Sequence, residues 1–257
     1  MKHHPYQRYK RQNLPEVSIS ETDGIRALHL ATETIQSAMD LYQPERLVLS
    51  YSQVMMAWLL FCDDAHHITH IGLGGGSMVR WLDYFFPDMK QIAIDINPQV
   101  VAIAQTMFEL PPESEQFQIV IADGAEFIQV FRQSTDIILS DAFDGEQIID
   151  DLVEEDFFVS CRQALSPRGI FVINLWSGDV RYRRFVERIE NAFDGQVIEI
   201  PATTHGNVAV MALNRQPENL LEKTLKQRAK HLTTQTQTDF MSIFHQARPD
   251  MIKRRYL

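Results

Sequence analysis

The chain has 257 residues, of which 45% are hydrophobic and 23% charged, as in an ordinary globular protein with a full hydrophobic core. The formal net charge is −10, and apart from the basic ends 1–12 and 216–257 the chain has 12 basic side chains against 30 acidic ones. Such an acidic body repels nucleic acid and attracts small cations. We therefore expect a small cationic partner and no nucleic acid.

Hydropathy and cysteine content exclude further classes of protein. The longest apolar run, Val54 to Cys62, has nine residues, whereas a membrane-spanning helix needs about 20. Residues 1–12 lack the apolar core of a secretory signal. The two cysteines, Cys62 and Cys161, and the adjacent His pairs do not have the spacing of metal ligands. The sequence thus predicts a cytoplasmic protein without a membrane segment or a metal site.

The first 48 residues predict a polar arm followed by a small β module. Val17 to Ser20 and Ile25 to Ala31 are strand-like runs, and Thr22-Asp23-Gly24 between them is a hairpin turn signal. A third short extended piece lies at Thr34 to Ser37. The next segment, Ser50 to Phe61, is apolar nearly all round and predicts a buried helix.

A glycine-rich stretch follows a short apolar strand, Ile68 to Ile71. The loop Gly72-Leu73-Gly74-Gly75-Gly76 allows a tight turn and close approach of a ligand, and Ser77 is a candidate cap for the helix after it. The next strand ends at Asp95, near the distance of roughly 20 residues that is typical of ribose recognition. This stretch predicts a nucleoside site.

After residue 97 the chain alternates between helices and strands. The predicted turn at Pro167-Arg168-Gly169 separates a helix from a strand. An antiparallel pair at the end of this region is unusual for folds that bind NAD and usual for the class that binds S-adenosylmethionine. We predict a doubly wound, Rossmann-like sheet of the methyltransferase type over residues 49–215 and a helical tail over 216–257. The predicted helices are Pro98 to Phe108, Ala125 to Phe131, Phe157 to Leu165 and Val180 to Phe193; the strands are Phe117 to Ile121, Asp136 to Ser140, Ile170 to Leu175, Val197 to Ile200 and Asn207 to Leu213.

Three successive predicted strands end on acids, namely Asp95, Asp123 and Asp141. In open sheets of this kind ligands bind beyond the carboxyl ends of the strands, so these three carboxylates are expected to converge on one site. The segment 141–156 adds further acids, eight in 16 residues with no basic residue, and would attract a cation.

From about Leu28 to Leu213 the chain resembles the aminopropyltransferases, that is, spermidine synthases and spermidine synthase-like proteins. The resemblance rests on motifs at the strand ends and on two residues of the N-terminal part. The matching residues are Gln36, Tyr51, Gly74-Gly75-Gly76, Asp95-Ile96-Asn97-Pro98, Asp123-Gly124 and Asp141-Ala142-Phe143-Asp144.

The resemblance implies a reaction and roles for these residues. The donor would be decarboxylated S-adenosylmethionine and the acceptor a di- or polyamine. Asp141 would be the base that accepts the proton of the attacking amine, while Asp144, Tyr51 and Gln36 would bind the amine. The donor would be held by Gly72, Gly74, Gly75, Gly76, Asp95, Asp123 and Gly124. Family members pair through their N-terminal region, so the resemblance also implies a homodimer.

Some positions differ from the family pattern, and they leave other functions open. Ser77 stands where family members carry an aspartate that pairs with the donor's aminopropyl ammonium. A serine would better tolerate the carboxylate of intact S-adenosylmethionine, so a methyltransferase is the second hypothesis. A third is a nucleoside-binding protein without catalysis, against which the pair Asp141 and Asp144 argues. A dehydrogenase fits less well, because no His or Lys is suggested as a hydride partner.

Overall fold

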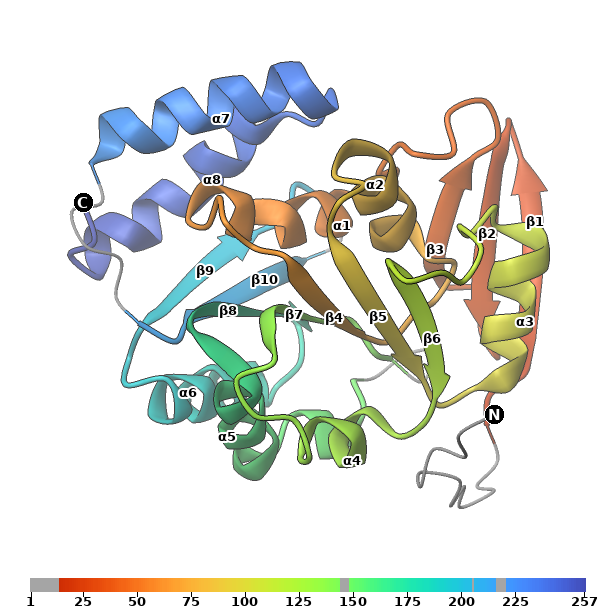
Figure 1. Ribbon diagram of the computed structural model, residues 1–257, viewed down its shortest axis with the longest axis horizontal. Helices are drawn as coiled ribbons and strands as arrows, with labels where there is room; N and C mark the ends of the chain where they lie inside the picture. Colours follow the sequence, from red (N-terminus) through yellow and green to blue (C-terminus); the bar gives the residue numbers. More distant parts are fainter. Residues whose placement is uncertain (1–13, 144–147, 205, 216–220) are drawn as a thin grey trace.

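The computed structural model describes residues 14–143, 148–204, 206–215 and 221–257, and it contains two sheets (Figure 1). The small antiparallel sheet has the order β1-β2-β3 and the large sheet the order β6-β5-β4-β7-β8-β10-β9. The strands are β1 (Val17–Thr22), β2 (Ile25–Leu30), β3 (Ile35–Asp40), β4 (His67–Ile71), β5 (Lys90–Asp95), β6 (Phe117–Ile121), β7 (Thr135–Ser140), β8 (Leu165–Trp176), β9 (Val197–Pro201) and β10 (Asn207–Leu213).

Helices connect the strands and cover both faces of the large sheet. They are α1 (Ser50–Met55), the 3₁₀ helix η1 (Met56–Leu60), α2 (Ser77–Phe85), α3 (Pro98–Met107), α4 (Gly124–Ile128), the 3₁₀ helix η2 (Asp150–Leu152), α5 (Glu155–Ala164), α6 (Tyr182–Ala192), α7 (Glu222–Thr236) and α8 (Phe240–Lys253). No helix among the described residues is both long and apolar enough to cross a membrane.

The large sheet has the predicted doubly wound topology. Strands β4 to β8 are parallel, and β10 runs antiparallel to both β8 and β9. The chain leaves central β4 toward β5 and β6 on one side and returns to β7 and β8 on the other. Because parallel strands end at the same edge, this arrangement brings the ends of β4, β5, β6 and β7 together there. The Rossmann-like fold with a terminal antiparallel hairpin is thus confirmed.

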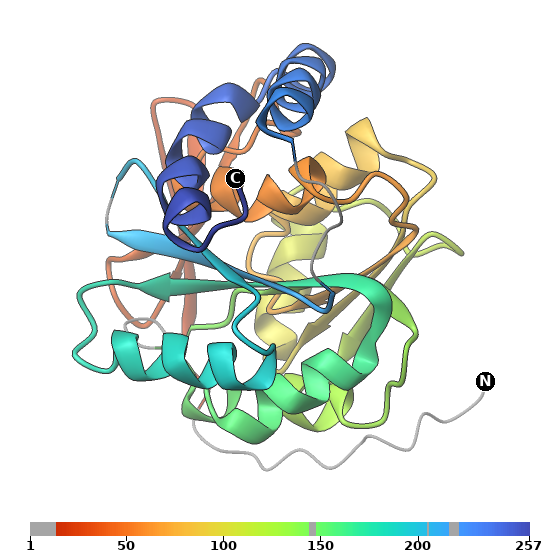
Figure 2. The same cartoon turned by 90° about the vertical axis from the view of Figure 1, so that its left-hand side faces the viewer.

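Helices lie on both faces of the large sheet (Figure 2), and their buried side chains form two hydrophobic layers. Buried side chains of α1, η1, α2, α7 and α8 form one layer, and those of α5 and α6, with Ile128 of α4, form the other. The small sheet packs on α3, where Leu28 and Met39 meet Val100 and Phe108. This contact places the small sheet beside the edge of the large sheet at which the parallel strands end.

The structure corrects two predicted elements. The segment Ser50 to Phe61 is not one α-helix, since it tightens into η1 where the amide of Met56 donates to the carbonyl of Gln53, three residues back. The predicted turn at Pro167-Arg168-Gly169 is an irregularity inside β8. Thr135 pairs with Leu165 and Ile137 already with Ile170, so the residues between them bulge from the ladder and the strand continues.

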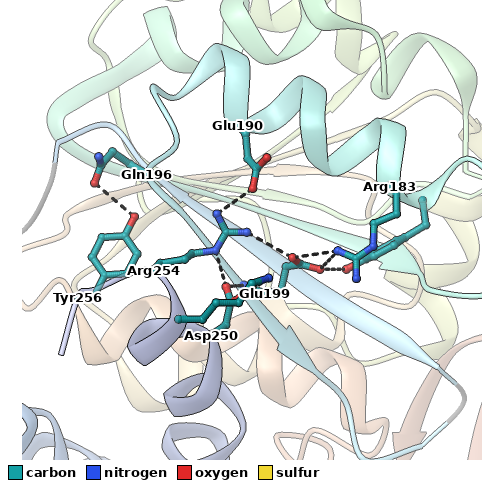
Figure 3. A network of polar contacts seen from close by, with 9 residues as sticks. Arg183, Glu190, Gln196, Glu199, Asp250, Arg254 and Tyr256 are labelled. Atoms are coloured by element: carbon teal, nitrogen blue, oxygen red, sulfur yellow. Dashed lines mark hydrogen bonds and ion pairs between the residues drawn. The ribbon is translucent and has the colours of Figure 1, made fainter.

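The C-terminal helix α8 is fixed to β9 and α6 by a cluster of ion pairs (Figure 3). The guanidinium of Arg254 lies 2.8 Å from Glu190 of α6, 2.6 Å from Asp250 of α8 and 3.3 Å from Glu199 of β9. Only 15% of the Arg254 side chain is exposed. Asp250 also accepts a hydrogen bond from the amide of Glu199, on the edge strand of the sheet. The cluster therefore covers an otherwise open sheet edge.

We expect Arg254→Ala to lower the free energy of unfolding by about 3 kcal/mol, because the change removes the largely buried cation that Glu190, Glu199 and Asp250 share. Urea denaturation measures this loss. Arg183→Ala is the matched control: Arg183 also contacts Glu199, at 3.3 Å, but its side chain is 73% exposed. That variant should lose less than about 1 kcal/mol. Equal losses in the two variants would contradict the role given to burial.

Candidate active site

A cavity of about 1220 Å³ lies where the parallel strands end, between the large sheet and the small one. The glycine loop forms one part of its wall, and residues of β3 and α1 form another. No Lys or Arg is among the described residues that line it. Six carboxylates line it instead: Asp95, Asp123, Glu126, Asp141, Asp150 and Asp151. The cavity is therefore suited to a cationic ligand.

The glycine loop has a backbone that side chains would not allow. Gly72 has a φ of +89°, and a Cβ built on it would lie 2.2 Å from the carbonyl oxygen of Asp141. Gly72, Gly74 and Gly76 line the cavity, as predicted for a loop that meets a ligand. Gly75 is not among the lining residues. It faces Phe108 instead, since a Cβ built on it would lie 2.7 Å from the ring of that residue. The loop is thus held by β7 on one side and by α3 on the other.

Asp95 lies at the end of β5 and accepts hydrogen bonds from the loop. Its Oδ2 accepts from the amide of Leu73 at 2.9 Å, and its Oδ1 from the amide of Asn97 at 2.8 Å. Burial raises the pKa of Asp95, and these backbone hydrogen bonds lower it. The amide of Gly74 is a third donor to this carboxylate, which has about four acceptor sites and therefore keeps capacity for a ligand in the cavity.

Asp123 and Gly124 stand where β6 passes into α4, and both line the cavity. Asp123 caps α4, with its Oδ1 accepting from the amides of Ala125 at 2.8 Å and Glu126 at 3.3 Å. A Cβ on Gly124 would come within 2.5 Å of Ile71, so the glycine lets α4 begin close to β4. The cap leaves Oδ2 of Asp123 for a ligand.

Asp141 directly follows the last residue of β7, and its carboxyl group is buried. Burial raises its pKa to about 6, against the lowering effect of hydrogen bonds from Asn174 and Tyr51. The Nδ2 of Asn174 donates to its Oδ1 at 3.0 Å. A carboxyl group with a pKa near neutrality beside a cavity has the properties of a general base.

Tyr51 and Gln36 come to the cavity from α1 and β3, respectively. The hydroxyl of Tyr51 donates to the backbone carbonyl of Gln36 at 2.8 Å, which links β3 of the small sheet to α1. Burial, followed by the nearby charge of Asp141, raises the pKa of Tyr51 well above its usual value, so its hydroxyl stays protonated. Asp144, the remaining residue predicted to bind the amine, lies outside the described residues.

Ser77 does not cap α2, contrary to prediction. The cap position is taken by Gly76 with a φ of +69°, which makes Ser77 the first residue of the helix. Its hydroxyl instead donates to the carbonyl of Ala38 at 3.1 Å and lies 3.0 Å from the hydroxyl of Ser37. Both serines line the cavity and form a neutral patch between the glycine loop and β3.

Sequence reasoning missed three polar residues that support the site. Asn207 of β10 donates to Asn174 of β8 at 3.0 Å, so a chain of amides runs from the terminal hairpin to Asp141. Behind the loop, the buried guanidinium of Arg80 donates to the carbonyls of Gly75 and Phe108. In the sequence Arg80 resembles an exposed helix residue and Asn174 merely interrupts an apolar run, so neither has a signal that marks it as special.

Three comparisons with known proteins agree with this geometry. Residues 49–197 match the Spermine/spermidine synthase domain. A polyamine aminopropyltransferase of Neisseria meningitidis (strain Z2491) is 57% identical over 93% of this chain and 92% of its own. One of Chromobacterium violaceum is 55% identical over 89% of both chains. A spermidine synthase solved with the transition-state analogue AdoDATO has the same fold, with a TM-score of 0.71 and 17% identity over 98% of this chain and 89% of its own.

Fold and site together define a Rossmann-like protein with an acidic cavity at the ends of its parallel strands. The domain match and the two bacterial relatives specify the class further. The chain belongs to the spermine/spermidine synthase family of enzymes.

Proposed function

We propose that this enzyme moves an aminopropyl group from decarboxylated S-adenosylmethionine to a di- or polyamine and releases methylthioadenosine. The observation that carries the proposal is the position of Asp141. This carboxyl group of raised pKa faces the same cavity as the glycine loop and the two strand-end acids Asp95 and Asp123. A base thus lies beside a nucleoside site, and the relatives named polyamine aminopropyltransferase support this reaction.

The reaction needs an amine with a free lone pair. The amine nitrogen attacks the carbon next to the sulfonium, a carbon–nitrogen bond forms, and the carbon–sulfur pair of electrons stays on sulfur as a neutral thioether. No acid is needed for the leaving group. The proton lost by the amine passes to the carboxylate of Asp141, which is held by Asn174.

The donor's nucleoside is placed against the glycine loop. We assign the ribose hydroxyls to Asp95 and the adenine amine to Asp123, both of which keep acceptor capacity beside their backbone hydrogen bonds. Asp144, Tyr51 and Gln36 are proposed to contact the amine.

The charge of the cavity favours the decarboxylated donor over intact S-adenosylmethionine. No described Lys or Arg lines the cavity to pair with the carboxylate of the intact donor, and the carboxylates that line it would repel that group. The neutral Ser37 and Ser77 neither add to this preference nor reverse it. Incubation of the purified enzyme with putrescine and the decarboxylated donor should yield methylthioadenosine; its absence with every di- and polyamine tried would overturn the proposal.

The dependence of activity on pH should reveal Asp141. Its carboxyl group must be ionised to accept a proton, so kcat/KM should fall about tenfold per pH unit below pH 6 and level off above it. The plateau arises because the amine binds as its ammonium form and loses its proton on the enzyme. Initial rates between pH 4.5 and 9 measure this profile. A rise that continues unbroken from pH 6 to 9 would show that the enzyme selects the free amine without this base.

We further propose a cytoplasmic homodimer. The free, buried Cys62 and Cys161 suit a reducing compartment. On the small sheet, Ile19 of β1 is 38% exposed and would provide apolar surface for a second copy. The division into residues 1–48, 49–215 and 216–257 likewise remains a proposal.

A further inference from the structure

We propose that Trp176 determines acceptor specificity by binding the distal ammonium group of the amine on the face of its indole ring. The proposal rests on the aminopropyl transfer proposed above and adds to it a residue that none of the sequence motifs includes. Trp176 is the last residue of β8 and lines the acidic cavity. Its side chain is 50% exposed, which places it at the mouth.

The register of the strands puts Trp176 on the side of the sheet that carries the base. Side chains two residues apart in a strand point to the same face, so Trp176 points with Asn174, the residue that donates to Asp141. The two residues are separated by roughly 7 Å along the strand, a distance comparable to the length of a short diamine. An amine attacking beside Asp141 therefore has its far end near the indole.

The indole lies against two glycines. A Cβ on Gly178 would come within 2.4 Å of its Cζ2, and one on Gly206 within 3.2 Å of its Nε1. Ser177 joins the end of β8 to the segment before β10, since its amide and its hydroxyl both donate to the carbonyl of Gly206, at 2.9 and 2.7 Å. The two glycines thus leave room for the indole and hold it at the mouth of the cavity.

The chemistry of this place fits an ammonium ion. Indole is the best of the aromatic rings for a cation–π contact. None of the cation–ring pairs among the described residues includes Trp176, and no described Lys or Arg lines the cavity. Half of Trp176 is exposed, so a cation from the substrate can reach the indole without displacing a protein cation, and the carboxylates of the cavity attract it.

Kinetics of two variants test the proposal. In Trp176→Leu the KM for putrescine should rise about fivefold to thirtyfold, with the KM for the donor unchanged and kcat within about twofold. Trp176→Phe, which keeps an aromatic face, should recover part of this loss. Tyr84→Leu is the matched control, because Tyr84 is 64% exposed and does not line the cavity. An unchanged putrescine KM in Trp176→Leu would overturn the proposal.

A monoamine separates recognition of charge from apolar packing. The inhibition constant of 1-aminobutane, which lacks the second ammonium, should change less than twofold in Trp176→Leu. If the inhibition constant of 1-aminobutane rose by the same factor as the KM for putrescine, the indole would make only apolar contact with the amine, and the proposal would be overturned. If the unaltered enzyme formed no methylthioadenosine at all, the proposed function would fail instead, and the two failures are distinct.

Fluorescence provides a direct readout. The protein has three tryptophans, and Trp58 and Trp81 are fully buried. With methylthioadenosine bound, putrescine should change the emission of the unaltered enzyme and leave that of Trp176→Phe unchanged. An amine-dependent change that persists in Trp176→Phe would contradict contact between amine and indole.

Discussion

Replacing Asp141 by Asn should lower kcat by about 10²- to 10⁴-fold while methylthioadenosine binds with nearly unchanged affinity. The amide oxygen can still accept the hydrogen bond from Asn174, so the site keeps its shape. What is lost is the group that takes the proton from the amine. Initial rates at saturating substrates and calorimetric titration with methylthioadenosine measure the two quantities.

The free energy of unfolding of Asp141→Asn separates the expected loss of kcat from misfolding. The pKa of Asp141 is raised from 3.8 to about 6 in the folded protein, so its carboxyl group binds more protons when folded than when unfolded between these values. Ionisation of Asp141 therefore opposes folding as pH rises through this window. At pH 8, Asp141→Asn should be at least as stable as the unaltered protein. If Asp141→Asn lost both methylthioadenosine binding and stability, Asp141 would instead be a structural residue.

A second large effect is expected from Gly72→Ala. The new residue would need a φ of +89° and would place its Cβ 2.2 Å from the carbonyl of Asp141, so β4 and β7 must move apart at the site. We expect a loss of about 3 kcal/mol or more in the free energy of unfolding and no measurable binding of methylthioadenosine. Urea denaturation and calorimetry measure both.

Gly195→Ala is the control for this change, because it imposes the same backbone penalty without the clash. Gly195 has a φ of +74°, and nothing lies within 4 Å of its Cβ position. This variant should lose about 1 kcal/mol and keep full activity. If Gly72→Ala behaved like Gly195→Ala, the close approach of the loop to β7 would have no importance for the site.

The clustering of the residues that we propose to bind the nucleoside was predictable because its signals are local. Gly72, Gly74 and Gly76 follow a buried strand, and Asp95 and Asp123 end the next two, so the rule for parallel sheets already brings them to one edge. The structure places all five on the cavity wall. Their proposed roles in binding the donor remain predictions.

The hydrogen bonds that hold Asp141 depend on pairing between distant strands and were not predictable. Asn174 reaches Asp141 because β8 lies beside β7, and Asn207 reaches Asn174 because β10 returns antiparallel to β8. In the sequence, Asn174 and Trp176 simply end an apolar run. The bulge in β8 escaped prediction for the same reason, because Pro167 and Gly169 signal a turn locally whereas pairing with β7 keeps the strand continuous.

Ser77 shows a tertiary contact overriding a local signal. A serine after a glycine loop is a common helix cap. Here Gly76 adopts the left-handed conformation and takes the cap position. The hydroxyl of Ser77 donates instead to the carbonyl of Ala38 in the small sheet. Only the packing of the small sheet against the loop decides this outcome.

A competition between donors tests the central claim most directly. The enzyme would receive equal amounts of decarboxylated and intact S-adenosylmethionine together with putrescine, and mass spectrometry would identify the nucleoside and amine products. We predict methylthioadenosine and an amine carrying one added aminopropyl unit, with no S-adenosylhomocysteine. S-adenosylhomocysteine with a methylated product would contradict aminopropyl transfer and make the enzyme a methyltransferase.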